Sequence, residues 1–120
     1  MHTKLLTKAQ HRQLLKNGEE QRAARDRGKS IDFHPVVNLF TPDAQATWLL
    51  SELYPDDPDV AFGLCDLGMG FPELGDVRIS ELEALRGPLN LTVERDRSFT
   101  AKQTLGECAK DAYAAERITA

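Results

Sequence analysis

The fold is decided by residues 46–67, which read ATWLLSELYPDDPDVAFGLCDL. Apolar, aromatic and β-branched side chains fill both ends of this stretch, as is typical of strands. Residues 55–59 between them hold two prolines and three aspartates, so we expect a loop that pairs poorly. Two strands joined by a short loop form an antiparallel hairpin, with strands at 46–54 and 60–67.

The loop sets an expected register for this hairpin. The predicted pairs are Tyr54 with Val60, Glu52 with Phe62, Leu50 with Leu64, and Trp48 with Asp66. Alternate residues of a strand share a face, so the paired residues are expected on one face of the sheet. Both faces of the hairpin are substantially apolar, which indicates that both are covered at least in part.

Further strands and three helices are expected on either side of the hairpin. Extended segments are predicted at 36–40, at 75–79 and within 91–99. Capping boxes predict helix starts at Thr7, Ser80 and Thr104. The motif Asn17-Gly18 is expected to end or weaken the first helix, which leaves 19–30 as a frayed helix or linker. Residues 86–88, Arg-Gly-Pro, are expected to end the second helix.

This order of elements predicts an α+β fold. An antiparallel sheet of four to five strands, arranged as a meander, is flanked by an N-terminal, a short middle and a C-terminal helix. The gaps between strands are too short for the crossover helices of a parallel sheet. The 120 residues suit a single domain, with a basic helical arm and linker at 1–30, the sheet core at 31–100 and the C-terminal helix at 101–120.

Charge is unevenly distributed along the chain. The net charge is −4, but residues 1–30 carry +5, residues 31–83 carry −10 and residues 84–120 carry +1. The basic arm has no interleaved aromatic residues to stack on bases, so a nucleic-acid partner is disfavoured. The acidic centre leaves DNA mimicry as a minor alternative. No apolar run approaches the roughly 20 residues of a membrane span. Residues 1–6 lack a secretory signal, and two distant cysteines favour the cytoplasm.

Two carboxylates of the hairpin are candidates for a pocket. Glu52 and Asp66 on an aromatic face would have raised pKa values suited to acid–base work. The alternative is that they lie at strand ends, facing water or Arg86. No metal or cofactor is expected, because the histidines are isolated and the cysteines lack ligand spacing. No catalytic residue is assigned, since Cys65 has no histidine placed beside it.

The most distinctive local motif is GMGFPELG at residues 68–75. It lacks the lysine and the long helix of the known phosphate-binding loops. An exposed tip at Phe71-Pro72 that contacts a partner is one interpretation. A wide turn whose Phe71 packs into the core is the other.

Several motifs in order resemble a bacterial family. They are FTPD at 40–43, ATW at 46–48 with Glu52, FGL at 62–64, ELG at 73–75, SELE at 80–83, RGPL at 86–89, and ERD at 94–96 with Phe99. Together they resemble the domain-of-unknown-function family two-nine-five-eight, over about residues 4–105. The resemblance implies a small protein of plasmids and conjugative elements, often encoded near antirestriction and transfer genes, with no activity or catalytic residues to carry over.

These observations predict an accessory protein of mobile genetic elements that acts by contact with an unidentified protein partner. The expected contact region is acidic and aromatic and consists of Trp48, Glu52, Asp66, Phe71 and Glu73. Arg86 is the expected structural ion-pair partner of a carboxylate. One alternative is a small-ligand binder or enzyme that uses Glu52 and Asp66 in a pocket. Another is single-strand nucleic-acid binding through the basic arm, with an affinity that falls steeply with salt.

Overall fold

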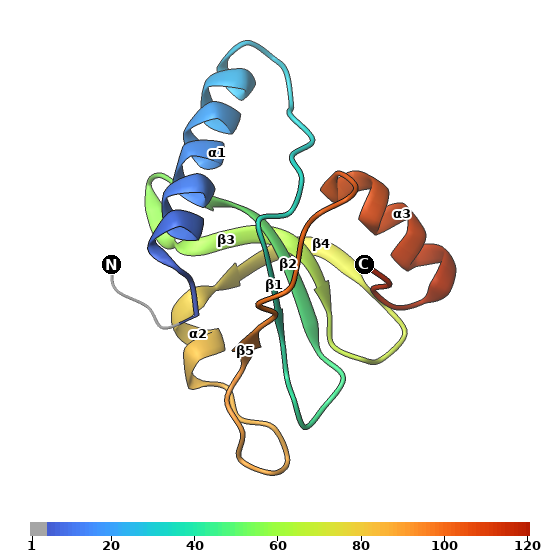
Figure 1. Cartoon of the computed structure of the whole chain (residues 1–120). Coiled ribbons are helices and arrows are strands. Elements are labelled where there is room, and N and C mark those ends of the chain that lie inside the picture. Colours follow the sequence, from blue (N-terminus) through green and yellow to red (C-terminus); the bar gives the residue numbers. More distant parts are fainter. Residues whose placement is uncertain (1–4) are drawn as a thin grey trace.

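The structure, a computed structural model, describes residues 5–120. Its elements are α1 (Lys8–Asp26), β1 (Val37–Phe40), β2 (Thr47–Tyr54), β3 (Asp57–Asp66), β4 (Glu73–Arg78), α2 (Ile79–Ala84), β5 (Glu94–Arg95) and α3 (Leu105–Ala115) (Figure 1). Residues 1–4 lie outside the described part. They belong to the segment 1–6 that was read for a secretory signal and to the predicted basic arm.

The five strands form one antiparallel sheet in the order β4-β3-β2-β1-β5. This confirms the predicted α+β fold. The first four strands are a meander, whereas β5 lies at the far edge, beside β1. Its position is held by the backbone N–H of Asp96, which donates to the Asn38 carbonyl at 2.9 Å, and by the buried side chain of Val93.

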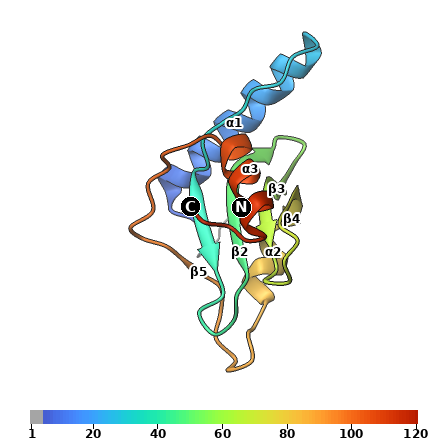
Figure 2. The same cartoon turned by 90° about the vertical axis from the view of Figure 1, so that its right-hand side faces the viewer.

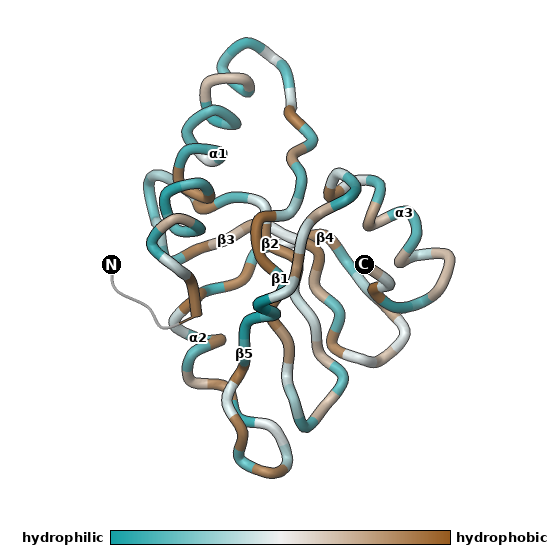
Figure 3. Tube along the Cα trace, viewed as in Figure 1, coloured by the Kyte–Doolittle hydropathy of each residue, from teal (hydrophilic) through white to brown (hydrophobic). Residues whose placement is uncertain are grey.

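Helices cover both faces of the sheet. On one face, Trp48, Leu50 and Leu53 of β2 pack with Leu14 of α1 and with α2. The opposite face is covered by α3, in a second cluster made of Leu49, Leu64, Leu105, Cys108, Ala109 and Ala112. Hydrophobic residues therefore concentrate along the central strands, while most of α1 is hydrophilic (Figure 3). The molecule has three layers, and α1 extends beyond the end of the sheet (Figure 2).

The first helix does not break at Asn17-Gly18. It is continuous from Lys8 to Asp26, so residues 19–26 are regular helix rather than a linker. Gly18 is buried against β2, where an added Cβ would collide with the Leu53 carbonyl oxygen. The Asn17 side chain donates to the Ser51 carbonyl at 2.9 Å. Asn17 and Gly18, which resemble a helix stop in the sequence, thus form a close contact between α1 and the sheet.

The hairpin turn is tighter than expected. Tyr54 pairs with Asp57, which leaves only Pro55 and Asp56 between the strands. The predicted pair of Glu52 with Phe62 is confirmed. Residues 57–59 belong to β3, although two aspartates and a proline disfavour strand structure. Arg78 of β4 offsets this preference by pairing with both aspartates, at 3.2 and 3.5 Å.

Beyond Glu52 the predicted register is wrong by one residue. Leu50 lies opposite Gly63, and Trp48 lies opposite Cys65 rather than Asp66. The cause is an irregularity in the ladder between Leu50 and Glu52, where Ser51 is an extra residue on β2. A bulge of this kind reverses the side-chain alternation beyond it.

Local capping patterns have different outcomes in the later helices. At α3, Thr104 and Glu107 form the predicted capping box. At α2, the helix begins at Ile79, and no side chain caps it. Ser80, the expected cap, instead donates its hydroxyl to Asp59 at 2.6 Å and its backbone N–H to the same carboxylate at 3.0 Å. A tertiary contact with β3 replaces the local one.

Candidate functional site

The loop between β3 and β4 exposes apolar side chains. We name residues 67–74, which are this loop and the first two residues of β4, the apolar loop. Phe71 is 79% exposed and Met69 is 70% exposed, and Leu67 and Leu74 are also exposed. Gly68 and Gly70 have φ values of +80° and +87°, which side-chain-bearing residues rarely adopt. Phe71 therefore lies at the surface, and the interpretation in which it packs into the core is wrong.

Asp66 holds the base of the apolar loop. Its buried carboxylate accepts the backbone N–H of Gly68 at 2.8 Å and that of Ile118 at 2.9 Å. One side chain thus ties the loop to the segment that follows α3. Both carboxylate oxygens bond to backbone amides, which indicates a structural role for Asp66.

The five predicted contact residues divide into two groups. Phe71 and Glu73 are exposed. Trp48 is 3% exposed and lies in the core, and Glu52 and Asp66 are buried as well. A surface that includes all five is not formed, because the helices cover both faces of the sheet. The sequence showed that both faces are apolar, but not that they are covered closely enough to bury these three.

Glu52 lines a cavity between α1 and the β2–β3 hairpin. We name it the Glu52 cavity. It has a volume of about 470 Å³, and its lining includes Gln21, Arg25, Glu52, Tyr54, Val60 and Asp76. Gln21 and Arg25 come from the second half of α1, which the sequence predicted as frayed. Asp66 lines a different cavity, beside Thr47 and Gly70. The shared pocket of Glu52 and Asp66 is therefore not formed.

Burial governs the electrostatics of the Glu52 cavity. Desolvation raises the pKa of Glu52, while the hydrogen bond from the Gln21 side chain, at 3.2 Å, opposes the change. The Tyr54 hydroxyl donates to Asp76 at 2.6 Å. Burial, followed by this bond to a carboxylate, raises the pKa of Tyr54 to about 12. At neutral pH the cavity therefore contains a neutral phenol and a carboxyl group that ionises less readily than usual.

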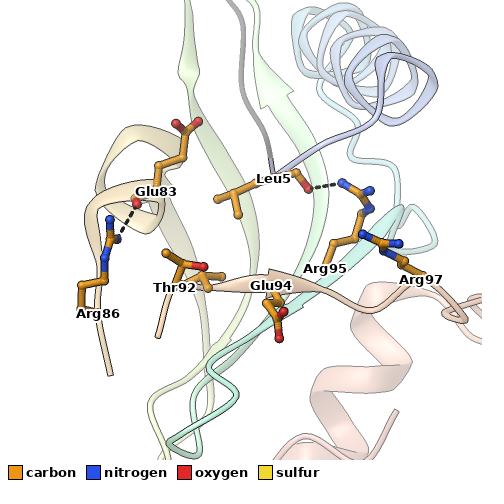
Figure 4. Close-up of a pocket in the computed structure, with 8 residues that line it drawn as sticks. Leu5, Glu83, Arg86, Thr92, Glu94, Arg95 and Arg97 are labelled. Atoms are coloured by element: carbon orange, nitrogen blue, oxygen red, sulfur yellow. Dashed lines mark hydrogen bonds between the residues drawn. The ribbon is translucent and has the colours of Figure 1, made fainter. Parts of the chain in front are cut away.

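A third cavity lies between the end of α2 and β5. It is lined by three arginines, Arg86, Arg95 and Arg97, together with Glu83 and Glu94. As Figure 4 shows, Arg86 donates to the Glu83 carbonyl, and Arg95 donates to the Leu5 carbonyl, each at 3.0 Å. No carboxylate in residues 5–120 lies within ion-pair distance of Arg86. The guanidinium, which was expected to pair with a carboxylate, binds backbone carbonyls near the C-terminus of α2.

The cysteines are not activated for nucleophilic chemistry. Burial raises the pKa of Cys65 to about 11, and it also raises the pKa of Cys108. Both thiols therefore stay protonated at neutral pH. Within residues 5–120, no group of three or more His, Cys, Asp and Glu side chains is placed to hold a metal ion. None of the helices in that range combines the length and apolar character that a membrane span requires.

Sequence reasoning missed three residues around Glu52. Gln21 lies in a polar segment without periodicity, and its side chain also bonds to both backbone groups of Ile31, at 2.8 and 2.9 Å. Tyr54 was placed on a strand, but nothing indicated its bond to Asp76. Asp76 lies 22 positions later in the chain, and only the pairing of β3 with β4 brings it close. The available signal was that Asp76 lies within the strand predicted at residues 75–79.

Fold and site together define a small three-layer α+β protein with an exposed apolar loop and a polar cavity. The chain belongs to the family described as "Protein of unknown function (DUF2958)", whose model matches residues 5–119. This match confirms the resemblance inferred from the motifs. No curated protein and no solved structure matches the chain.

Proposed function

We propose that this chain is a cytoplasmic accessory protein of mobile genetic elements, that it acts by binding another protein, and that the apolar loop provides the contact. The exposure of Phe71 and Met69 carries this proposal. The mobile-element setting follows the family resemblance. The partner is expected to offer an apolar pocket that accepts the Phe71 ring.

The construction of the loop supports a binding role. The exposure of large apolar side chains to water is unfavourable. A partner that covers them removes this apolar surface from water, which favours binding. The two positive-φ glycines and the Asp66 hydrogen bonds define the backbone path, so the loop presents these side chains on an ordered base. Preorganisation of this kind reduces the entropy lost on binding.

Charge near the loop further restricts the partner. The exposed carboxylate of Glu73 follows Phe71 by two residues. Gly70 lies near the side chain of Glu116, so a second acid borders the loop. A partner surface with basic side chains around its apolar pocket would therefore be complementary.

Affinity capture from a host that carries the element tests this proposal. The double variant Phe71→Ala with Glu73→Ala removes the aromatic anchor and its neighbouring charge. We expect it to lose a protein that the unmodified chain captures, and its affinity for that purified protein to fall at least about 30-fold.

The matched control is Leu89→Ala. Leu89 is 75% exposed, but it lies in the loop that follows α2. This variant should capture the partner as well as the unmodified chain does. Equal capture by the double variant and the control, with both folded by circular dichroism, would remove the apolar loop as the contact site.

A further inference from the structure

We infer that the open edge of β4 binds an extended segment of the partner protein, which joins the sheet as a further strand. This inference rests on the function proposed above and specifies how the partner reaches the apolar loop. Three observations support it. They are an unpaired backbone edge, charged side chains that turn away from this edge, and a glycine in the middle of β4 that the fold does not require.

The outer edge of β4 has unpaired backbone groups. β4 is the last strand of the sheet on the side away from β5, and its neighbour is β3 (Figure 1). Within residues 5–120, the backbone groups of residues 73–77 bond to no segment other than β3. Alternate residues of an antiparallel strand direct N–H and C=O groups to opposite sides, so the outer groups are free to bond to another chain. An extended backbone matches such a row of donors and acceptors.

Two charged side chains that could protect this edge turn toward the rest of the sheet. Edge strands commonly carry charges that prevent pairing with other chains. Here Arg78 pairs with Asp57 and Asp59 of β3, at 3.2 and 3.5 Å. Asp76 accepts the Tyr54 hydroxyl of β2 at 2.6 Å. Because β3 and β2 both lie on the inner side of β4, neither charge protects the outer edge.

Gly75 lies in the middle of β4, where no feature of the fold within residues 5–120 requires a glycine. Its φ is not in the left-handed region, and β3 and β4 pair without a bulge. A Cβ atom at this position would meet no atom within 4 Å, whereas at Gly18 and Gly63 it would collide with a carbonyl oxygen of β2. A glycine within a strand weakens the strand and often marks the close approach of a ligand or another backbone. The open space beside Gly75 therefore indicates a group that approaches from outside.

Continuity with the apolar loop favours the partner as the occupant of this edge. Leu74 belongs both to the apolar loop and to β4, so a strand added to this edge runs past the loop. Phe71 lies three positions before Leu74 and is exposed. The edge and the loop thus form one continuous surface, and a single extended segment contacts both.

The side chains of β4 define the chemistry of the added strand. Glu73, Gly75 and Val77 alternate along β4 and share a face, on which the opposite residues of an added strand would contact them. The Glu73 carboxylate has no cationic partner within residues 5–120, so a basic residue is complementary to it. The space beside Gly75 accepts a large side chain, and Val77 favours an apolar one. Along an antiparallel strand, the expected order at every second position is therefore apolar, aromatic and basic.

A synthetic peptide tests the inference on the full chain. Its sequence is Thr-Val-Thr-Tyr-Val-Lys-Thr, with both ends blocked, so that the first valine, the tyrosine and the lysine lie opposite Val77, Gly75 and Glu73. We expect titration calorimetry to show binding with a Kd below about 1 mM, and hydrogen exchange to slow at the amides of β4. Absence of binding at about 1 mM peptide, or binding that leaves exchange in β4 unchanged, would overturn the inference.

Two N-methylated forms of the peptide test whether its backbone makes the contact. Methyl groups on alternate backbone nitrogens block one edge of the peptide strand and leave its other edge free. One form should therefore bind at least about tenfold more weakly, and the form methylated in the other phase should bind as the parent peptide does. Equal binding by the two forms would refute strand addition.

The variant Gly75→Val separates binding from a structural role. Valine favours strands and its Cβ meets open space, so the variant should be at least as stable as the unmodified chain. It fills the space for the tyrosine and should weaken peptide binding at least about tenfold. Thr92→Val adds the same side chain at an exposed position between α2 and β5, and this control should bind normally. Loss of stability in Gly75→Val would show that the fold itself requires glycine, and unchanged peptide binding would remove the edge as the site.

Two further measurements identify the occupant. Loss of capture by both Gly75→Val and the double variant Phe71→Ala with Glu73→Ala would support the added strand. If Gly75→Val captures the partner normally while the double variant loses it, the apolar loop remains the contact and the added strand is refuted. Sedimentation of the chain alone examines the other occupant. A dimer that Gly75→Val dissociates would assign the edge to a second copy of the chain and would also overturn the inference.

Discussion

Two buried acids of the hairpin show how the environment decides the role of a residue. Asp66 accepts two backbone N–H groups, and these bonds satisfy both of its oxygens. Glu52 accepts one side-chain amide and borders a cavity. The residue types are nearly equivalent in sequence, yet one stabilises a loop and the other bonds to a side chain of α1 at the edge of a cavity. Hydrogen-bond partners distant in the chain make the difference.

The substitution Glu52→Gln is expected to stabilise the protein at neutral pH. Burial raises the pKa of Glu52 above its ordinary value of 4.5, so the folded state favours the protonated form. The stabilisation from this preference is fully present below pH 4.5 and is lost as the pH rises through the raised pKa. Glutamine stays neutral, so the advantage of the variant grows as the pH increases.

Urea denaturation from pH about 4 to about 8 measures this effect as the free energy of unfolding. The control Glu73→Gln, at an exposed position, should show little change with pH. A difference between Glu52→Gln and the unmodified chain that does not vary with pH would show that burial leaves the pKa of Glu52 unchanged.

At the scale of elements, α1 is the helix whose observed extent differs most from what its sequence predicts. Asn17-Gly18 is typical of a helix end, but the helix continues for two further turns. Gly18 allows the Leu53 backbone to approach, and Asn17 bonds to Ser51 beside it. The extension places Gln21 and Arg25 over Glu52. The Glu52 cavity therefore depends on Gly18, which helix propensity alone would place at the end of a helix.

The substitution Gly18→Ala separates these two interpretations. Alanine favours a helix over glycine by about 0.8–1.0 kcal/mol, so a gain would be expected if Gly18 only weakened the helix. Because the added Cβ collides with the Leu53 carbonyl, we expect a net loss of about 1–3 kcal/mol. Urea denaturation measures the change, and Glu19→Ala at the exposed neighbouring position is the control. A more stable Gly18→Ala variant would contradict the contact.

At the scale of the whole molecule, one sheet supports two separate cores. Adjacent residues of β2 contribute to different clusters, with Leu50 facing α1 and α2 and Leu49 facing α3. Neither face is left to solvent as a docking platform. A partner must therefore bind elsewhere, and the most exposed large apolar side chain in residues 5–120 is Phe71 of the apolar loop.

Paired substitutions at these two positions test the three-layer arrangement. Leu49→Ala and Leu50→Ala should each cost about 2–5 kcal/mol, because both side chains are fully buried. The exposed Leu89→Ala should change the free energy of unfolding by no more than about 0.5 kcal/mol. If either core substitution had as little effect as Leu89→Ala, the corresponding helical layer would not cover the sheet.

The amino-acid sequence by itself determined the class of the fold and most of its elements. Apolar runs with turn residues between them indicate β1 to β4, and the box of Thr104 and Glu107 indicates α3, because both signals act between neighbouring residues. Prediction of the candidate sites was less complete. Of the predicted contact residues, Phe71 and Glu73 are exposed, whereas Trp48, Glu52 and Asp66 are buried.

Only the tertiary structure decided the features that depend on distant contacts. The extra residue at Ser51 shifts the register, and the Leu53 carbonyl requires Gly18. Gln21 of α1 bonds to Glu52, and Asp76 of β4 bonds to Tyr54. Local propensity is a preference of less than about 1 kcal/mol for most residues, so packing and hydrogen bonds between remote segments override it where they conflict.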